Sequence, residues 1–507
     1  MTTFLQRKPL PVARELLLAG IEPLAAEEIA VEEACGRVTA EEVLAQHPAP
    51  HYQASAMDGI AVRARDTFAA SAQEPVRLTV WNRDEAPPPD QAVCRPVDTG
   101  SLLPPWADAV VRIEEARAAG DAFEIRTPSP PGRDLRVAGE DIDAGTVVVP
   151  AGHRLRAYDL GALLATGNSR VLVRQRPSVG ILATGNEVVE PNRAAAAGQV
   201  IEYNSRVLAA LIEEWGGQPV RLGIFADNED ALLGALDQAR RSFDVVCAIA
   251  GSSAGRKDLT IAVLQQLGDV FVHGVDIAPG RPVALARIGT TPVLAVPGYP
   301  VAAIVAAEQL LQPLLARLSG TGEQARATLE ARVGRKIVSR TGIEEFRRVC
   351  LTRGHDGYVV GMLPQGAGSI STITGAHGWL RIPPEVEGLD AGSRASVELI
   401  VTQAEVDASM VVSGSPCEQT AALERALRLL DPRARVMHLR LAGLDASIAV
   451  ERGEAHLAVA SAGCTLANPA VRLVLASDRD AAFVGPAAAA TAPPVLAAVK
   501  SGVLAEA

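Results

Sequence analysis

The stretch Val179 to Glu187, with the sequence VGILATGNE, joins an apolar run to a glycine corner and decides the fold. Val179 to Ala183 has the length and apolar character of a strand that is covered on both faces. Strand and helix patterns then alternate along the chain as far as Leu318. This alternation predicts a parallel sheet with helices on both faces.

The elements around that first strand can be placed from their patterns. We expect three further strands, at Val220 to Phe225, Val245 to Ala250 and Val293 to Val296. We expect a helix capped by Asn204, a second capped by Asp227, and a third from Val301 to Leu315.

Three glycine-rich corners follow these strands. They are Ala183-Thr184-Gly185-Asn186-Glu187, Ala250-Gly251-Ser252-Ser253-Ala254-Gly255 followed by Asp258, and Pro297-Gly298-Tyr299-Pro300. A glycine corner where a strand enters a helix exposes backbone N–H groups to an anion. Three corners on one edge predict a site for a large phosphorylated ligand.

Length and charge set the outer limits. A chain of 507 residues is too long for a single hydrophobic core, so we expect several domains. The net charge of −11 argues against duplex nucleic acid as a partner, because that partner selects a basic face. An anionic small ligand would need a local basic pocket.

The cysteine pattern and the chain start indicate the compartment. The six cysteines are scattered without a C-x-x-C pair, so neither a zinc site nor a disulfide framework is expected. The start of the chain lacks the pattern of a signal peptide, and we find no stretch that approaches a transmembrane span. We therefore expect a cytoplasmic protein that does not use the membrane.

Changes of pattern divide the chain. Helical periodicity from about Ala13 to Val43 gives way to short apolar runs between Pro and Gly turns, which are typical of a small antiparallel β-domain. The fold class that we expect is multidomain α/β plus β. The expected parts are a helical linker at 1–47 and 142–176, a β-rich domain at 48–141, a parallel-sheet α/β domain at 177–320, a second β-domain at 321–404 and an α/β half-domain at 405–507.

A set of seven short motifs carries a family resemblance. The motifs are Ser55-Ala56-Met57-Asp58-Gly59, Asp98-Thr99-Gly100, Gly139-Glu140-Asp141-Ile142, Thr184-Gly185-Asn186-Glu187, Gly255 to Asp258, Pro279-Gly280-Arg281-Pro282 and Pro297-Gly298-Tyr299-Pro300. In order and spacing they resemble the molybdopterin molybdotransferases, the MoeA and gephyrin E-domain family, over roughly residues 8 to 403. The tail resembles a periplasmic-binding-protein-like domain fused to some members, of which about half is present.

The resemblance implies insertion of molybdate into adenylylated molybdopterin with release of AMP, helped by Mg²⁺. It also implies a homodimer, in which Thr99 contacts the ligand from across the dimer, and a molybdopterin adenylyltransferase as a partner protein. Splitting a phosphoanhydride needs charge neutralisation at the phosphates, which Mg²⁺ held by carboxylates supplies.

The resemblance assigns roles to individual residues. The implied catalytic carboxylates are Asp58, Asp141, Glu187 and Asp227, and the implied metal ligands are Glu187 and Asp258. The implied cofactor-binding residues are Thr99, Gly185, Gly251, Ser252, Ser253, Gly255, Arg281, Pro297, Gly298, Tyr299 and Pro300.

Several of these residues have a purely structural alternative. Asp227 and Asp258 are equally placed to cap helices, and Asp58 can serve as a turn residue. Glu187 is harder to explain in that way, because a short polar turn would suffice for folding at its position. Ser252 and Ser253 have no His or Asp partner in local sequence, which favours hydrogen bonding over nucleophilic catalysis.

The chain also departs from the family pattern. Asn186 replaces a usual Asp, Ala278 replaces a usual Lys, and Arg281 replaces the Lys of the Pro-Gly-Lys-Pro segment. Arg136, Arg256 and Lys257 could supply compensating charge. A non-catalytic molybdopterin-binding or ligand-sensing protein therefore remains an alternative, a pure scaffold has less support, and molybdate and tungstate are not distinguished.

Overall fold

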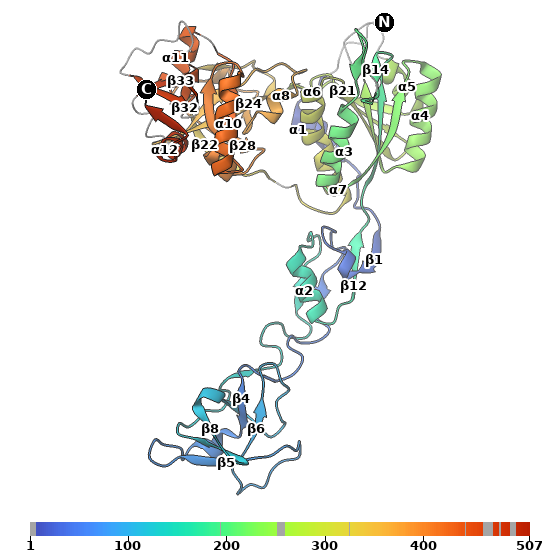
Figure 1. Cartoon of the computed structure of the whole chain (residues 1–507). Helices are drawn as coiled ribbons and strands as arrows, with labels where there is room; N and C mark the ends of the chain where they lie inside the picture. The colour runs from blue at the N-terminus through green and yellow to red at the C-terminus, as the bar shows by residue number, and fades with distance from the viewer. Residues whose placement is uncertain are drawn as a thin grey trace. The chain divides into compact units, whose positions relative to one another are not determined.

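The computed structural model describes residues 7–192, 194–250, 259–323, 325–441, 443–459, 470–475, 478–486 and 493–506. The chain divides into two compact units (Figure 1). Unit 1 contains Met1–Glu22, Pro177–Leu318 and Gly322–Ala507, and unit 2 contains Pro23–Arg176 and Ser319–Thr321.

The centre of unit 1 is a six-stranded sheet. Its strands, in spatial order, are β16 (Gln218–Phe225), β13 (Ser178–Thr184), β17 (Val245–Ala250), β21 (Thr291–Pro297), β20 (Ala284–Ile288) and β18 (Asp269–His273). The first four are parallel, as the sequence predicts, but β20 and β18 run antiparallel to their neighbours. The expectation of a wholly parallel sheet is therefore corrected to a mixed sheet. The cause is local, since only Gly289 and Thr290 separate β20 from β21, and a two-residue turn reverses the chain.

Helices cover both faces of this sheet (Figure 1). They are α3 (Asn204–Glu214), α4 (Glu229–Ser242), α5 (Leu259–Leu267), α6 (Pro300–Ala306) and α7 (Gln312–Leu318), with one π-helical turn, η4 (Ala307–Leu311), between α6 and α7. Figure 1 shows α3 and α6 on one face and α4 and α5 on the other. The inner strands are consequently buried over most of their length, β13 and β21 above all, whereas the edge strands β16 and β18 are mostly partly exposed.

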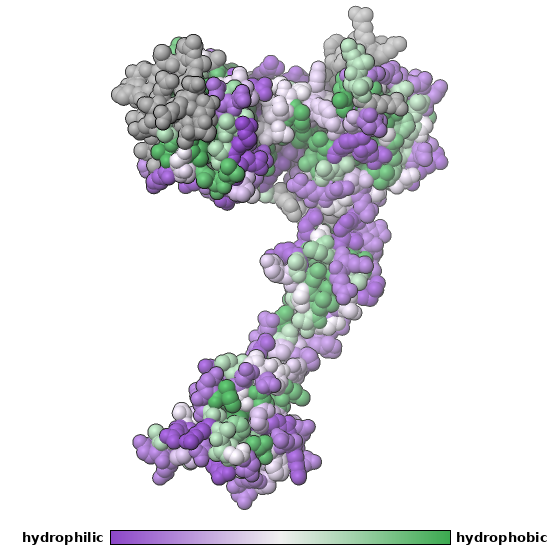
Figure 2. Space-filling view, viewed as in Figure 1, coloured by the Kyte–Doolittle hydropathy of each residue, from purple (hydrophilic) through white to green (hydrophobic). Residues whose placement is uncertain are grey.

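The run Pro300–Leu318 corrects one expectation. It has the length and apolarity of a membrane span, but 83% of its apolar window is buried inside the protein. It is a core helix that packs against the sheet through α6 and against α1 (Leu10–Leu18) through α7. The surface viewed in Figure 2 is mostly hydrophilic, with smaller hydrophobic patches between.

Two helix caps differ from the sequence prediction. Tyr203, not Asn204, precedes α3, and the backbone N–H of Ser205 is bound by the buried Glu202 side chain. Asn228, not Asp227, caps α4, since its side chain accepts hydrogen bonds from the N–H groups of residues 230 and 231. Both predicted caps lie one residue from the helix end that needs a partner, so Asn204 and Asp227 are free to serve another purpose.

The second β-domain is a closed barrel. Its strands are β22 (Thr328–Val333), β24 (Glu344–Gly354), β25 (Gly357–Met362), β26 (Gly378–Ile382) and β28 (Arg394–Leu399). The pairing of β24 with β26 closes the ring, and the short β19 (Ile277–Ala278) of the α/β domain adds to β24. The barrel core is a single cluster that includes Val349, Leu351 and Val397.

The C-terminal extension is an α/β unit that shares a core with the barrel. Its sheet contains, in order, β30 (Val436–Leu439), β29 (Met410–Ser413), β31 (Leu457–Val459), β33 (Asp478–Pro486), β32 (Ala470–Leu475) and β34 (Leu504–Glu506). Its helices are α9 (Gln403–Ala408), α10 (Glu418–Leu430), α11 (Gly443–Glu451) and α12 (Pro493–Lys500). One hydrophobic cluster joins Cys350 and Leu363 of the barrel to Val411, Met437 and Ala449 of the extension. The extension and the barrel therefore pack as one body.

Unit 2 is less helical than the sequence indicates. Of the expected helical run from about Ala13 to Val43, the structure has α1, which belongs to unit 1, and the short 3-10 helix η1 (Val31–Glu33). Between them lies β1 (Ala26–Ala30), which pairs antiparallel with β12 (Arg170–Arg174). The α-helix in this region is α2 (Ala157–Ala165). The expectation of a wholly helical linker is wrong because Ala26–Ala30 finds its partner about 140 residues later, which local periodicity does not reveal.

The small β-domain of unit 2 has one six-stranded sheet. Its order is β7 (Ala109–Arg112), β4 (Gly59–Val62), β6 (Val93–Val97), β5 (Val76–Val80), β9 (Ala122–Ile125) and β8 (Ala116–Ala119). The pairs are antiparallel, as expected, except that β5 and β6 are parallel. Shorter strands complete the unit: β2 (Val43–Leu44), β3 (Ala54–Ser55), β10 (Leu135–Arg136) and β11 (Val147–Val149).

Two buried histidines predict how unit 1 responds to acid. Burial lowers the pKa of His377 and of His456 from 6.5 to about 4. Below pH 6.5 the unfolded chain binds protons that the folded chain does not, so stability is complete above that pH and falls on acidification towards pH 4. We expect a loss of about 2 kcal/mol per histidine between pH 6.5 and about 5.

Urea unfolding at pH values from about 7.5 to 5 measures this loss. A variant with both His377→Asn and His456→Asn should start less stable and show a shallower dependence on pH. An equal slope in the parent and in this variant would contradict the assignment to the two histidines.

Candidate functional site

The carboxyl ends of four parallel strands meet at one edge of the central sheet. Thr184 pairs with Phe225, Ala183 with Ile249, and Ala250 with Pro297. The first and third glycine corners therefore follow β13 and β21, the two strands that flank β17, and lie at the same edge. In an open α/β sheet this edge is where ligands bind.

The first corner is held by backbone geometry that suits glycine. Gly185 has φ of 144°, and its N–H donates to the carbonyl of Phe225 at 3.2 Å. The side chain of Glu187 folds back over this glycine, since a Cβ at position 185 would lie 3.1 Å from Glu187 Oε1. Glu187 itself is exposed, so its carboxylate is open to a ligand at the corner.

Asn186 connects the first corner to the end of β16. Its Oδ1 accepts a hydrogen bond from the backbone N–H of Asp227 at 3.2 Å. Asp227 is exposed and lies two residues after the end of β16 at Phe225, so it is at the same edge as Glu187. The departure from the family pattern at Asn186 therefore has a structural role, which is to hold the backbone that carries Asp227.

The third corner is tied to α3 by a contact that the sequence did not reveal. The Asn204 amide donates to the carbonyl of Gly298 at 2.6 Å. Pro300 begins α6, while Gly298 and Tyr299 are exposed at the strand end after the buried Pro297. The ring of Tyr299 lies against Gly368 of the barrel, where a Cβ would come within 3.3 Å. Asn204 and Gly298 are 94 positions apart in the sequence, so local patterns could not predict their contact.

Arg281 lies at this edge because β20 is antiparallel. Ala284 begins β20 and pairs with Ala295 near the end of β21, so the preceding segment Pro279 to Val283 reaches the same edge. Arg281 is half-buried, and its carbonyl accepts from the N–H of Val275 at 2.9 Å. Ala278 lies in β19 and pairs with Glu345 of the barrel. Arg281 is thus a cation near the corners, while Ala278 contributes no charge.

The second corner falls outside the described residues. Gly251, Ser252, Ser253, Gly255, Arg256, Lys257 and Asp258 all belong to that segment. The structure describes β17, which leads into it, and α5, which follows it.

The site residues of unit 2 occupy neighbouring loops of its β-domain. Asp58 Oδ1 accepts a hydrogen bond from the N–H of Thr99 at 2.7 Å, and this bond lowers the pKa of Asp58 below its ordinary value. Both residues are exposed. Asp58 therefore serves as the turn residue that its sequence allowed, and in doing so it sets the position of Thr99.

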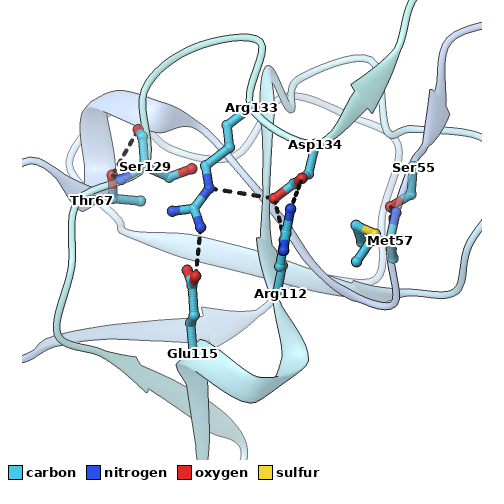
Figure 3. A network of polar contacts seen from close by, with 8 residues as sticks. All are labelled: Ser55, Met57, Thr67, Arg112, Glu115, Ser129, Arg133 and Asp134. Atoms are coloured by element: carbon cyan, nitrogen blue, oxygen red, sulfur yellow. Dashed lines mark hydrogen bonds and ion pairs between the residues drawn. The ribbon is translucent and has the colours of Figure 1, made fainter.

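A charged network holds the Asp58 turn in place (Figure 3). Arg112 donates two hydrogen bonds to Asp134, at 3.0 and 2.9 Å, and Arg133 links Asp134 to Glu115. These contacts lower the pKa of Asp134, mainly through the hydrogen bonds from Arg112. The carbonyl of Asp134 accepts from the N–H of Ala56, so the network supports the motif that carries Asp58. No sequence motif marks Asp134, whose φ of 52° is the unusual feature of this segment.

Asp141 lies in the loop after β10, and β10 pairs with β3, the strand just before the Asp58 turn. The Asp141 N–H donates to the carbonyl of Ala49 at 3.1 Å. The hydrogen bond to Glu140 and the charge of Glu140 raise the pKa of Arg136, and the charge of Asp141 adds a smaller effect in the same direction. Arg136 is paired with Glu140 at 2.6 Å and is opposite Ala54 in the β3–β10 pair. Arg136 is therefore already partly neutralised and is not a free substitute for the missing lysine.

The carboxylates fit a magnesium ion that is shared with a ligand. Among the residues that the structure describes, no three His, Cys, Asp or Glu side chains form a ready metal cluster. Mg²⁺ commonly binds through one or two carboxylates together with water and substrate phosphates. Glu187 and Asp227, on adjacent strand ends, match this requirement.

A mixed α/β sheet with glycine corners, a cation and two carboxylates at one edge defines a protein that binds phosphorylated ligands. Three family models match the chain between residues 9 and 400: "MoeA N-terminal region (domain I and II)" at residues 9–167, "Probable molybdopterin binding domain" at 180–317, and "MoeA C-terminal region (domain IV)" at 330–400. The chain belongs to the MoeA molybdopterin molybdotransferase family.

Known relatives agree over most of the chain. Molybdopterin molybdenumtransferase 2 of Mycobacterium tuberculosis is 32% identical over 73% of this chain and 94% of its own length. The molybdopterin molybdenumtransferase of Haemophilus influenzae is 32% identical over 59% of this chain and 74% of its own. A crystal structure of a molybdopterin biosynthesis MoeA protein from Pyrococcus horikosii has a TM-score of 0.69 and 32% identity, and covers 78% of this chain and 100% of its own.

Proposed function

We propose that this chain inserts molybdate into adenylylated molybdopterin and releases AMP. The observation that carries the proposal is the convergence of Glu187, Asp227, Gly298 and Arg281 at one sheet edge, inside the segment that matches the molybdopterin-binding model. The names of the relatives support the same reaction.

Each group at the edge has a chemical task in this reaction. The exposed Asn186 and Glu187 of the first corner and the exposed Gly298 of the third would present backbone N–H groups to the ligand phosphates. Arg281 offers guanidinium donors to an oxyanion, in a planar geometry that differs from that of a lysine. Bound there, Mg²⁺ would neutralise the charge that develops on the phosphates as AMP leaves.

A role for Asp227 in catalysis is supported by the finding that it does not cap α4. The sequence left open whether it caps α4, and Asn228 fills that role. An exposed carboxylate beside Glu187 is therefore available for the metal or for water. We propose Glu187 and Asp258 as the metal ligands and Asp227, Asp58 and Asp141 as further catalytic carboxylates.

The wider arrangement follows the family. We propose a cytoplasmic homodimer in which Thr99, with its turn supported by Asp58, contacts the ligand from the partner subunit. A molybdopterin adenylyltransferase would deliver the substrate. We also propose that residues 405–507 form a partial periplasmic-binding-protein-like unit and that 48–141, 177–320 and 321–404 are separate domains. The parallel strands β29, β30 and β31 support an α/β unit of that kind.

Release of AMP tests the proposed reaction. Purified protein is incubated with adenylylated molybdopterin, Mg²⁺ and molybdate, and AMP and the product cofactor are measured by chromatography. AMP should appear only when all three are present, with tungstate as a parallel arm. Tight binding of the pterin without AMP release would favour the non-catalytic binding protein instead.

A further inference from the structure

A cavity lies between the barrel and the C-terminal extension, and none of the residues at the sheet edge described above lines it. Its volume is about 690 Å³, which is within the range of small-molecule sites. The outer face of β22, β25 and β28 forms one side, and the end of α11 with the turn after it forms the other. Ala331 contributes to the barrel core, so its neighbour Arg332 projects from the opposite, cavity-facing side of β22.

The two walls of this cavity are joined firmly. The Thr352 hydroxyl donates to the carbonyl of Glu454 at 2.5 Å, and Arg335 binds the Glu454 carboxylate at 2.6 Å. His456 accepts from the N–H of Val411 through Nδ1, so its Nε2 carries the proton and donates to the carbonyl of Arg353 at 3.1 Å. These bonds and the shared core preform the cavity.

Arginines are concentrated on the cavity walls. Arg332 and Arg394 are directly opposite each other in the β22–β28 pair, and both line the cavity. Like charges in that position repel, which costs stability unless an anion lies between them. Arg452 lines the opposite wall, and its carbonyl accepts from Arg332 at 2.9 Å. Among the described residues, the Arg394 and Arg452 side chains form no ion pair.

The other residues that line the cavity favour a ligand larger than a simple ion, because they include acidic, aromatic and apolar side chains. Glu330 and Asp356 also line the cavity and would accept hydrogen bonds from a ligand. Tyr358 adds an aromatic ring whose hydroxyl is already bound to Asp407 at 2.5 Å. Val359 and Val450 add apolar surface.

We propose that this cavity binds a small organic anion. A phosphate or carboxylate group lies between Arg332 and Arg394, while a ring or apolar body lies against Tyr358 and the donors of the ligand face the acidic rim. This site is separate from the molybdopterin edge, and its existence does not depend on the reaction proposed there.

The test uses the full chain with two probes, AMP for a phosphate source and citrate for a carboxylate source. Hydrogen exchange followed by mass spectrometry locates binding, because AMP can also occupy the sheet edge. At millimolar probe, exchange should slow in segments 328–333 and 392–399. In Arg394→Gln, the probe concentration needed for the same protection should rise by about 10- to 100-fold, as expected for the loss of a charged hydrogen bond.

Two further variants separate binding from folding. Arg332→Gln should act in the same direction, whereas Arg425→Gln makes the same charge change on exposed α10, outside the cavity, and should leave protection unchanged. Protection by AMP alone identifies a phosphate ligand, and protection by citrate alone identifies a carboxylate ligand. The proposal is overturned if neither probe slows exchange in these segments, or if Arg394→Gln and Arg425→Gln behave alike.

Discussion

Glu187→Ala is expected to lower the rate of AMP release at least about 100-fold, because a metal ligand contributes several kcal/mol of charge stabilisation to the transition state. The thermal midpoint should stay within the error of the parent. Glu187 is exposed, and its carboxylate forms no hydrogen bond or ion pair with the described part of the chain that the substitution would remove. Steady-state AMP release at saturating molybdate, with calorimetry as the folding check, measures both quantities.

The matched control for this variant is Glu213→Ala. Glu213 is an exposed glutamate near the end of α3, and α3 begins at the sheet edge beside Gly298 and leads away from it. Its replacement should leave AMP release unchanged. Raising the Mg²⁺ concentration should partly restore Glu187→Gln, which keeps one oxygen. An unchanged rate in Glu187→Ala would contradict the metal site, and a lowered thermal midpoint would show that the residue is structural.

Arg335→Ala is expected to destabilise the contact between the barrel and the extension by about 3–5 kcal/mol, because it leaves a buried carboxylate without its partner. The Glu454 side chain is 0% exposed, whereas that of Arg335 is 32% exposed. The two nitrogens of Arg335 both bind Glu454 Oε2, at 2.7 and 2.6 Å. The free energy of opening, measured by native-state hydrogen exchange at 450–456, reports this loss.

Because Glu454 is buried and Arg335 is partly exposed, the two single substitutions should have unequal costs. Glu454→Gln removes the buried charge and leaves an arginine that can reach water, so it should cost less than Arg335→Ala. The double variant Arg335→Ala with Glu454→Gln should be more stable than Arg335→Ala alone, since no charge remains buried. Arg340→Ala, at an exposed site in the same region, is the control. A double variant less stable than Arg335→Ala would show that packing, not charge, dominates.

The central domain could be predicted because its signals are local. An apolar run such as Val179 to Ala183 is a strand in almost any surroundings once helices cover it, and the corner at Gly185 follows from the glycine itself. The direction of β20 was not predictable from the same signals. Apolar residues indicate a strand whether it runs parallel or antiparallel. The direction of β20 relative to β21 is set by the two-residue turn at Gly289 and Thr290.

The candidate site was partly predictable for a related reason. Glu187 and the exposed Gly298 follow strands that end at the same edge, so their residue type and position were sufficient. The contacts of Asn204 with Gly298 and of Arg112 with Asp134 join segments that are distant in sequence. The two predicted helix caps were each wrong by one residue, because the position of a cap depends on backbone angles that cannot be read from the sequence.

The sequence by itself determined the family, the strand and helix content of the central domain, and the residue types at its glycine corners. These depend on apolar periodicity and on short motifs, which act over a few residues. The tertiary structure alone decided that the barrel closes through β24 and β26, that the extension shares its core, and that Arg332 lies opposite Arg394. The physical reason is that register and packing between distant segments depend on the whole folded chain, which no local pattern contains.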